Sequence, residues 1–248
     1  MRVFAVYSIK GGVGKTASAV NVADLAARSG LRTLLWDLDP QGAASFYLRV
    51  KPKVKGGAEK LLRGKRSIRH WLRASDFDGL HLLPADFSYR NMDLVLDAQK
   101  KPRKRLSRLL APLAKRYDAV FLDCPPSVSL LSESVFQAAD AVLSPTIPTP
   151  LSLRSYDQLV RHLDELVGKP PRLLPFLAQV DRRKKIHCDI MDQIPSSHPE
   201  FLKSWIPSAS VVEQMGTHRA PLGAFAPRSH AGLAYASLWD EVQSAFPE

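Results

Sequence analysis

Short apolar runs alternate with polar and amphipathic stretches along the whole chain. The clearest runs are residues 3–7, 31–36, 79–85, 117–122, 141–146 and 173–180. Each is five to eight residues long and rich in Val, Leu or aromatic residues, as expected of strands buried on both faces. The stretches between them carry apolar residues at helical spacing. This alternation predicts an α/β fold with a doubly wound, mostly parallel sheet and helices on both faces.

The expected helices follow these strands along the chain. They cover residues 17–29, 92–96, 100–116, 155–167 and 231–246. Gly30 is placed to end the first helix in the left-handed conformation that glycine adopts easily. Leucines at helical spacing in the third helix face the sheet, and basic residues form its outer face, with Pro112 expected to bend or break it late. Since no repeat or linker is visible, residues 1–248 are predicted to form one domain.

A glycine-rich loop joins the first predicted strand to the first helix. Residues 8–16 read Ser-Ile-Lys-Gly-Gly-Val-Gly-Lys-Thr. Glycines allow successive backbone N–H groups to surround an anion, and the helix N-terminus adds partial positive charge at the same place. Lys15 is expected to reach the β- and γ-phosphates of a nucleotide, and the Thr16 hydroxyl to hold Mg²⁺. The predicted nucleotide-binding residues are Lys10, Gly11, Gly12, Val13, Gly14, Lys15, Thr16 and Ala17.

The loop departs from the standard phosphate-binding pattern in two places. Ile9 occupies the position of the first glycine, and a second lysine, Lys10, begins the loop. This pattern resembles the deviant Walker A loop of the ParA/MinD ATPases. The resemblance implies that the chain binds ATP and Mg²⁺ and forms a homodimer in which Lys10 reaches the partner subunit's nucleotide. The alternative is a glycine-rich turn with two solvated lysines, and the flanking strand and helix argue against it.

Two carboxylates follow the second predicted strand. Asp37 and Asp39 are two residues apart, so their side chains point the same way while the chain stays extended. In an open α/β sheet this position lies over the ligand crevice, where the pair would orient a water or support the hydration shell of Mg²⁺. An isolated Asp-x-Asp-Pro motif is more often a helix cap and turn. Asp-Leu-Asp-Pro-Gln resembles the ParA branch, which implies that Asp39 acts in hydrolysis and that Asp37 supports the metal without binding it directly.

Another apolar strand ends in Asp123 and continues as Cys-Pro-Pro-Ser. An apolar strand ending in aspartate is a Walker B arrangement, in which Asp123 binds Mg²⁺ through water and completes the metal site begun by Thr16. The sequence Asp-Cys-Pro-Pro-Ser resembles the ParA family's version of this motif. It places Cys124 in a rigid turn and makes a reactive or metal-binding thiol the poorer interpretation. The predicted catalytic residues are Lys10, Lys15 and Asp39.

The distribution of charge indicates the kind of partner. The 248-residue chain has a formal charge of +11 and a pI near 9.8. Residues 49–73 contain ten basic residues and one acidic residue, and residues 100–116 contain eight basic residues and no acidic one. Such clustering favours a polyanion such as nucleic acid over a surface that is merely basic. Residues 49–75 are interpreted as a basic, variable insert, for which DNA contact and solvated surface remain equal alternatives.

Further cations lie beyond the last predicted strand. The adjacent residues Arg182, Arg183, Lys184 and Lys185 form a natural phosphate contact. The ParA family has Asp-x-Arg here and uses the arginine for DNA in some members, which corresponds to Arg183. The Ile206-Pro207 segment resembles the one that packs on adenine in the family, which implies a nucleotide contact for Pro207. The family's next residue, arginine, is Ser208 here, so Arg219 and Arg228 are the substitute DNA contacts.

The sequence also limits the compartment. No apolar run approaches the ~20 residues of a membrane span, and the N-terminus enters a strand without a signal-peptide pattern. Cys124 and Cys188 form no disulfide or metal-ligand pattern, so a reducing cytoplasm is expected. Because the chain opens on its first strand, we expect it to lack the N-terminal DNA-reading extension of longer ParA proteins.

The resemblance extends over nearly the whole chain and implies a ParA-like positioning ATPase. An ATP-bound homodimer would bind DNA without sequence preference, and a ParB-like or cargo-adaptor partner would stimulate slow hydrolysis. The protein is then expected to be cytoplasmic, associated with the nucleoid and independent of membranes.

Three other interpretations stay open. A MinD-like membrane ATPase needs a C-terminal amphipathic helix with a basic polar face, whereas residues 237–248 are acidic. A metabolic enzyme on the same scaffold needs a substrate pocket that the sequence does not identify. A basic, non-enzymatic scaffold with an inactive loop is opposed by the intact residues Lys15, Thr16 and Asp123.

Overall fold

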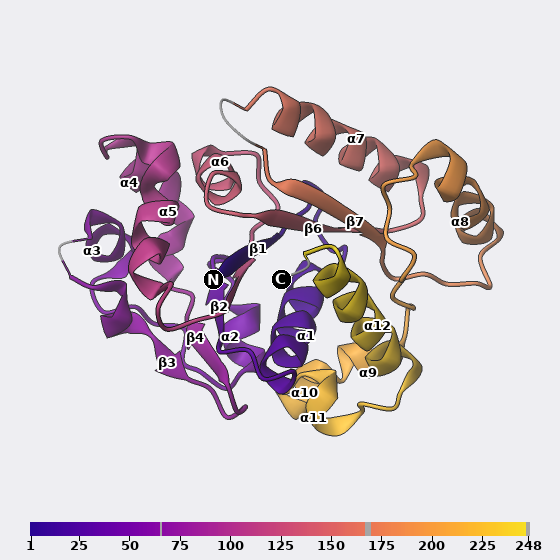
Figure 1. The fold of residues 1–248 in the computed structure, drawn as a ribbon, viewed down its shortest axis with the longest axis horizontal. Coiled ribbons are helices and arrows are strands. Elements are labelled where there is room, and N and C mark those ends of the chain that lie inside the picture. Colours follow the sequence, from indigo (N-terminus) through magenta and orange to yellow (C-terminus); the bar gives the residue numbers. More distant parts are fainter. Residues whose placement is uncertain (65, 167–169, 247–248) are drawn as a thin grey trace.

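One seven-stranded sheet forms the centre of the molecule (Figure 1). The computed structural model describes residues 1–64, 66–166 and 170–246. The strand order is β3-β4-β2-β5-β1-β6-β7, and neighbours pair in parallel except β3, which is antiparallel to β4 at one edge. The strands are β1 Arg2–Val6, β2 Thr33–Asp37, β3 Arg73–Ala74, β4 Leu80–Leu83, β5 Ala119–Asp123, β6 Ala141–Thr146 and β7 Arg172–Leu177.

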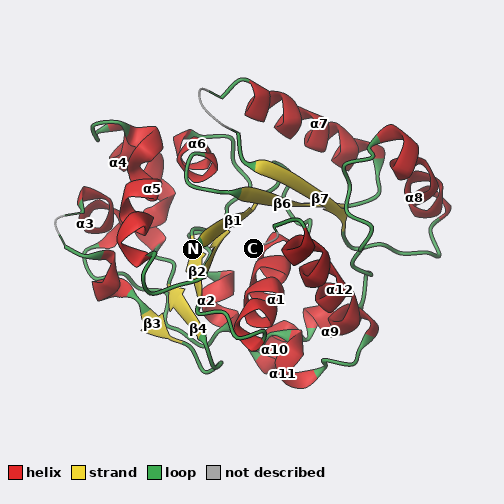
Figure 2. Cartoon of the chain, in the orientation of Figure 1, coloured by secondary structure: helices red, strands yellow, loops and turns green. Residues whose placement is uncertain are grey.

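Helices cover both faces of this sheet, as the colouring by secondary structure makes visible (Figure 2). Those packed on one face are α3 Gly57–Arg63, α4 Met92–Asp97, α5 Arg105–Leu110, α6 Leu130–Phe136 and α7 Pro150–Asp164. Those packed on the other face are α1 Lys15–Arg28, α2 Ala43–Tyr47, α9 Ser210–Glu213, α10 Met215–His218, α11 Leu222–Phe225 and α12 His230–Ser244. Helix α8 Lys185–Ser197 packs with α7 and the segment after β7 in a smaller cluster. The predicted doubly wound, mostly parallel sheet is confirmed.

The central strand β1 shows why helices must cover both faces of the sheet. Val3 and Ala5 belong to the apolar cluster under α3 to α7, whereas Phe4 and Val6 belong to the cluster under α1 and α12. Successive side chains of a strand point to opposite faces, so an all-apolar strand requires a layer on each side. Phe4 stacks on Phe121 of β5 with ring centroids 5.1 Å apart, which ties the two strands together through their side chains.

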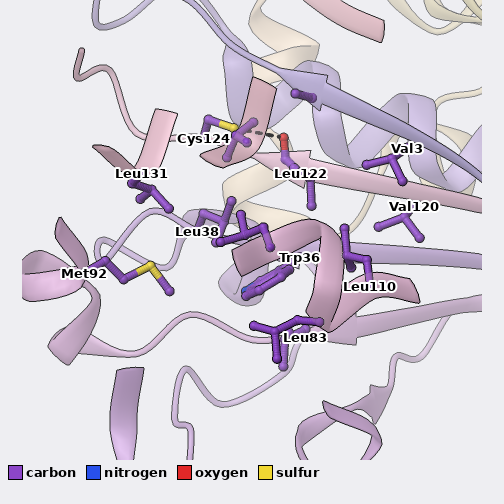
Figure 3. Packing of buried hydrophobic residues seen from close by; sticks show 14 of the residues in the cluster. Val3, Trp36, Leu38, Leu83, Met92, Leu110, Val120, Leu122, Cys124 and Leu131 are labelled. Carbon is purple, nitrogen blue, oxygen red and sulfur yellow. Dashed lines mark hydrogen bonds between the residues drawn. The ribbon is translucent and has the colours of Figure 1, made fainter. Parts of the chain in front are cut away.

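The turn after β5 is rigid, as the sequence predicted for Cys124. Its thiol is buried and donates a 3.4 Å hydrogen bond to the carbonyl of Leu122 (Figure 3). The same view shows Leu38 and Leu131 lining this cluster under the helices. Burial raises the pKa of the Cys124 thiol well above its usual value, which keeps it protonated and unreactive.

The prediction of one helix over residues 100–116 is wrong, although the break expected at Pro112 is confirmed. The segment forms three short pieces, which are η3 Pro102–Lys104, α5 and η4 Ala111–Leu113. Each short 3₁₀ piece has proline at its start, and proline can neither donate to the preceding turn nor fit inside a helix without strain. The predicted apolar face is correct although the helix is interrupted, because its four leucines are buried in the core. They are Leu106, Leu109, Leu110 and Leu113.

Other element boundaries differ by a few residues. Helix α1 ends at Arg28 and Gly30 has a φ of +93°, as the predicted glycine stop requires. Helix α7 begins at Pro150 instead of residue 155, because proline is well suited to the first helical turn. The predicted strands 79–85 and 173–180 are shorter, as β4 and β7. The predicted end of α7 at residue 167 and the last two residues of the 237–248 tail lie outside the described residues.

The basic insert is folded. Gly56, with a φ of +93°, caps α3, and the 3₁₀ helix η1 Ile68–Trp71 follows before the edge strand β3. A second 3₁₀ helix, η2 Phe87–Asn91, leads into α4. Lys65 lies outside the described residues. Among the helices that the structure describes, none is long and apolar enough to cross a bilayer.

Candidate functional site

The glycine loop lies between the end of β1 and the start of α1. Gly12 and Gly14 have φ values of +73° and +88°, a left-handed conformation that favours glycine. Gln179, which follows β7, donates a 2.6 Å hydrogen bond from Nε2 to the carbonyl of Gly12. A Cβ on Gly14 would lie 3.6 Å from the same Nε2 atom. The loop is therefore supported from the side, with the positive end of the α1 dipole directly behind it.

Lys15 is the buried cation of this loop. The residue is 7% exposed, and its Nζ donates a 3.1 Å hydrogen bond to the carbonyl of Lys10. Burial lowers the pKa of Lys15, and the charge of Asp123 acts in the opposite direction. Lys10 itself is only half-buried at the start of the loop. The two predicted lysines thus lie together in different environments, one enclosed and one open to solvent.

Asp37 and Asp123 end the neighbouring strands β2 and β5 as register partners. Both residues are 0% exposed. Oδ2 of Asp37 accepts hydrogen bonds of 2.8 and 2.7 Å from the backbone N–H and hydroxyl of Ser45 in α2. Burial raises the pKa of Asp37 to about 6. Burial, followed by the charge of Asp37, raises the pKa of Asp123 well above its usual value, whereas Thr16 and Lys15 oppose that rise.

The environment of Asp123 fits a cation. Neither of its carboxylate oxygens receives a hydrogen bond of normal geometry in the described structure, although the Thr16 hydroxyl is close enough to lower its pKa. An unpartnered buried carboxylate is costly unless a positive ion accompanies it. Carboxylate and hydroxyl oxygens are the hard ligands that Mg²⁺ prefers, and Mg²⁺ usually takes only one or two of them from protein. The described residues hold no group of three or more His, Cys, Asp or Glu side chains able to bind a metal alone, so phosphate and water would complete the shell.

Asp39 lies just beyond the end of β2 and is partly exposed. Its Oδ1 accepts a 2.9 Å hydrogen bond from the backbone N–H of Gln41, which fixes the turn through Pro40. Its negative charge contributes to the pKa shifts of Lys15, Asp37 and Asp123, so it belongs to the same electrostatic group. Asp37 is sealed against Ser45 whereas Asp39 faces water, a difference that suits the separate roles predicted for them.

A small cavity of about 150 Å³ lies beside the loop. Gly14 and Ala17 form one side, Pro207 and Ser208 another, and Tyr235 of α12 closes it. A parallel bridge between Val180 and Pro207 holds the second side in place. Pro207 is therefore close to the glycine loop although 193 residues separate Pro207 from Gly14 in sequence, a position that suits a contact with the base or ribose of a nucleotide.

The predicted cationic loop lies after β7, at the start of α8. Arg182, Arg183, Lys184 and Lys185 are all exposed. Arg183 is held by Asp181 through hydrogen bonds of 2.9 Å to each carboxylate oxygen, and these bonds hold the pKa of Asp181 at about 2. Nδ1 of His187 accepts a 3.0 Å hydrogen bond from the backbone N–H of Asp181, which steadies the loop. This loop borders a groove of about 460 Å³ that also includes Pro207, so it lies next to the cavity beside the glycine loop.

Arg219 and Arg228 lie in different surroundings. Arg228 is exposed before α12, whereas Arg219 is part of a clasp between α10 and α2. Nε of Arg219 donates a 3.2 Å hydrogen bond to the backbone carbonyl of Phe46. The Arg219 guanidinium also lies 4.7 Å from the centre of the Phe46 ring. Arg49 donates in return to the carbonyls of Arg219 and His218, at 2.9 and 3.1 Å. Arg219 thus has a structural task that its predicted role did not include.

Three residues of the site were missed by sequence reasoning. Ser45 binds Asp37, Gln179 supports the glycine loop and Tyr235 lines the cavity beside that loop. Gln179 is a polar residue near the end of an apolar run, which is a weak signal for a residue at a sheet's ligand edge. Nothing in the local sequence distinguishes Ser45 or Tyr235, because their importance depends on distant partners.

Comparison with known proteins gives the same picture. Residues 1–172 match the family described as AAA domain. The chromosome partitioning protein ParA of Caulobacter vibrioides is 32% identical over 193 residues, which cover 75% of this chain and 72% of that protein. The sporulation initiation inhibitor protein Soj of Bacillus subtilis is 28% identical over 250 residues, which cover 97% of this chain and 98% of that protein.

A solved structure extends the comparison to three dimensions. Cobyrinic acid a,c-diamide synthase from Mycobacterium smegmatis, with a bound ATP analogue and magnesium, superimposes with a TM-score of 0.82 at 26% identity. The match covers 99% of this chain and 96% of that one. The deviant glycine loop, the paired strand-end aspartates and these relatives agree, and the chain belongs to the ParA/MinD family of P-loop ATPases.

Proposed function

We propose that this protein is a ParA-like positioning ATPase that binds ATP and Mg²⁺, dimerises in that state and attaches to DNA without sequence preference. A ParB-like or cargo-adaptor partner stimulates its slow hydrolysis of ATP to ADP and phosphate, which releases it from DNA. Its place is the cytoplasm, on the nucleoid. The names of the partitioning relatives support this function over others that use the same scaffold.

The observation that carries the proposal is that Lys10 and Lys15 lie together in the glycine loop but differ in burial. Lys15 is enclosed and already directed into the loop by the Lys10 carbonyl, while the Lys10 side chain belongs to a half-buried residue at the rim. One lysine therefore suffices for the phosphates of its own subunit. The second is available to those of a twin subunit facing it, and this would make dimer formation depend on the nucleotide.

The roles of the site residues follow from their environments. Lys15 binds the β- and γ-phosphates, and backbone N–H groups of the loop surround them. Thr16 and, through water, Asp123 hold Mg²⁺, which neutralises charge on the phosphate oxygens. Asp39, the partly exposed carboxylate, orients the attacking water, and Asp37 stays bound to Ser45 and supports the hydration shell of the metal. Catalysis by this set is positioning and electrostatic stabilisation without a covalent intermediate.

The DNA contacts in this proposal include the exposed loop Arg182, Lys184 and Lys185, with Arg183, Arg219 and Arg228 as further candidates. Cations at the nucleotide-bearing end of the sheet can meet phosphates from both subunits once the dimer closes. Binding through phosphates alone is sequence-independent and strongly dependent on salt.

The test measures dimer formation and DNA retention together. Purified protein is incubated with a non-hydrolysable ATP analogue, with ADP or without nucleotide, each with Mg²⁺, and analysed by light scattering and on random-sequence duplex. Dimers and DNA retention limited to the analogue support the proposal. A protein that stays monomeric with the analogue, even when Asp39→Ala prevents hydrolysis, would refute it.

The similarity to the M. smegmatis synthase favours one alternative, a metabolic enzyme that activates a small carboxylate with ATP. Phosphate release that rises with a small carboxylic acid and an amine donor, and does not respond to DNA, would support that function. A membrane platform has weaker support, because Leu238, Trp239 and Val242 of α12 are buried in the core and are not available for lipid.

A further inference from the structure

Two basic segments that are far apart in sequence form one surface. Helices α3 and η1 pack against α5 and η4 near the β3 edge of the sheet, at the left of Figure 1. Arg105 donates from Nε to the carbonyl of Leu62 in α3, and Arg69 donates a 3.1 Å hydrogen bond to the carbonyl of Pro112 in η4. We call residues 51–64, 66–73 and 100–116 the basic lobe. Each segment thus supplies an arginine that binds the backbone of the other.

The cations of this lobe divide into two groups. Some are occupied within the fold: Arg69 and Arg105 bind carbonyls, Arg63 pairs with Glu59 at 2.5 Å and Arg103 pairs with Glu133. Others are exposed, and in the described part of the chain their side chains have neither a hydrogen bond nor an ion pair. The second group includes Lys55, Lys60, Arg66, Lys100, Lys101, Lys104 and Arg108. The paired cations stabilise the fold, and the unpaired cations are available to bind a ligand.

A cavity of about 370 Å³ concentrates the second group. Lys55, Lys60, Arg63 and Arg66 line it around Trp71. Trp71 is 1% exposed, and its Nε1 donates a 3.1 Å hydrogen bond to the carbonyl of Lys55, so the floor of the cavity is fixed. The stem of Lys60 lies against Gly56, where no Cβ would fit. Three of these cations, Lys55, Lys60 and Arg66, have no described ion pair, so they repel one another, and an anionic ligand would relieve that repulsion.

The lobe has the features of a phosphodiester contact and lacks those of other partners. Membrane surfaces and protein grooves recruit exposed apolar side chains beside the cations. Among the described residues, none of the large exposed hydrophobic side chains lies within the basic lobe itself, and Phe87 and Leu94 are exposed on the neighbouring η2 and α4. A DNA backbone requires only cations at intervals along its phosphates. The charge also continues past the cavity onto η3 and α5, through Lys104 and Arg108, which suits a long polyanion better than a compact one.

We propose that the basic lobe binds the phosphate backbone of double-stranded DNA, with a phosphate seated among Lys55, Lys60 and Arg66. The inference rests on the proposed function, because DNA attachment depends on it, and it assigns a site at the opposite end of the sheet from the loop before α8 (Figure 1). A closed dimer would present this site twice, in addition to any contact that its cationic loops make.

The test removes two unpaired charges of the basic lobe and compares the effect on DNA binding with the loss of two charges elsewhere on the surface. Lys60→Gln with Arg66→Gln is measured beside Arg154→Gln with Arg161→Gln, which are exposed arginines of α7 without a described ion pair. All proteins are full-length, carry the ATP analogue and Mg²⁺, and are titrated with random-sequence duplex at several salt concentrations. Dimer formation and thermal melting on the same samples report whether the fold and the nucleotide response are intact.

We expect the lobe variant to weaken DNA binding by at least about tenfold at ~100 mM salt and to lower the salt slope by about 1.8, for two lost contacts. The α7 variant should stay within about twofold of the parent protein, and Lys60→Arg with Arg66→Lys should retain binding because charge is kept. Unchanged affinity and slope in the lobe variant, while the parent protein binds DNA, would overturn the inference alone. A parent protein that binds anionic phosphatidylserine vesicles and ignores DNA would overturn the proposed function, and this inference with it.

Discussion

Asp37 and Asp123 lie side by side at the ends of adjacent parallel strands, both completely buried, and of the two only Asp37 accepts hydrogen bonds of normal geometry in the described structure. Two buried acids in register destabilise each other's charged form, so the apo protein has a built-in cost at neutral pH. A magnesium ion that arrives with the nucleotide would offset that cost. The pair therefore links nucleotide binding to the stability of the sheet's central strands.

The first prediction concerns stability and pH. Because burial raises the folded-state pKa of Asp123 above its unfolded value, stability falls as pH rises through that pKa. Asp123→Asn should raise the stability of nucleotide-free protein at pH 8 by at least ~1 kcal/mol, or about 2–4 °C in Tm. The difference should shrink as pH falls towards about 3.9, the ordinary pKa of aspartate, because the acid is then protonated in the unfolded protein as well. Thermal melts with and without ADP and Mg²⁺ check this, since the variant should also lose the ligand's stabilisation. A variant less stable than the parent at pH 8 would contradict it.

Substitutions of the two loop lysines should affect different properties of the protein. Lys15→Ala removes the enclosed phosphate contact and should abolish both nucleotide binding and phosphate release. Lys10→Ala keeps the Lys10 carbonyl, so nucleotide binding within a subunit should remain while ATP-dependent dimers are lost. Fluorescent-nucleotide titration and light scattering separate the two properties. Equal loss of nucleotide affinity in both variants would mean that Lys10 acts within its own subunit.

Asp39→Ala should uncouple binding from turnover. Its carboxylate is open to water and hydrogen-bonded only to the adjacent turn, so its loss should leave the fold and nucleotide binding intact. Phosphate release should fall by about 100-fold or more, a typical effect of losing a group that orients the reacting water, and dimers should accumulate with ATP itself. Single-turnover phosphate release and sizing of the ATP-bound protein provide the check. Dimers that disappear as quickly as in the parent would exclude this role.

The glycine loop offers a matched pair of substitutions. Gly14→Ala places a Cβ at a φ of +88° and next to Gln179, and should destabilise the protein by about 1–2 kcal/mol. At Gly11 a Cβ would meet only Pro126, at 3.9 Å, and Gly11 does not have a positive φ, so Gly11→Ala should change stability by less than ~0.5 kcal/mol. Denaturant unfolding of both nucleotide-free variants measures the difference. Similar losses at the two positions would show that conformation is not the cause.

The sequence was informative where the signal was local and uninformative where a partner was distant. The apolar runs predicted the parallel strands. The glycine loop and the aspartates that follow two of the strands predicted which residues lie together at one edge of the sheet. The edge strand β3 is two residues long and carries no periodic pattern, so it could not be predicted. The segment 100–116 satisfied a helical pattern that its prolines interrupt. Ser45 was missed because its role depends on tertiary contact with Asp37.

The separation between arginines that hold the basic lobe together and cations that face solvent has an evolutionary consequence. If the basic lobe binds DNA as proposed, substitutions at Lys60 or Arg66 would alter how strongly it binds, while the backbone bonds of Arg69 and Arg105 persist. Selection for a different ionic strength could then act on DNA affinity alone. Lineages would diverge fastest at these outward positions and leave the hydrolytic centre unchanged.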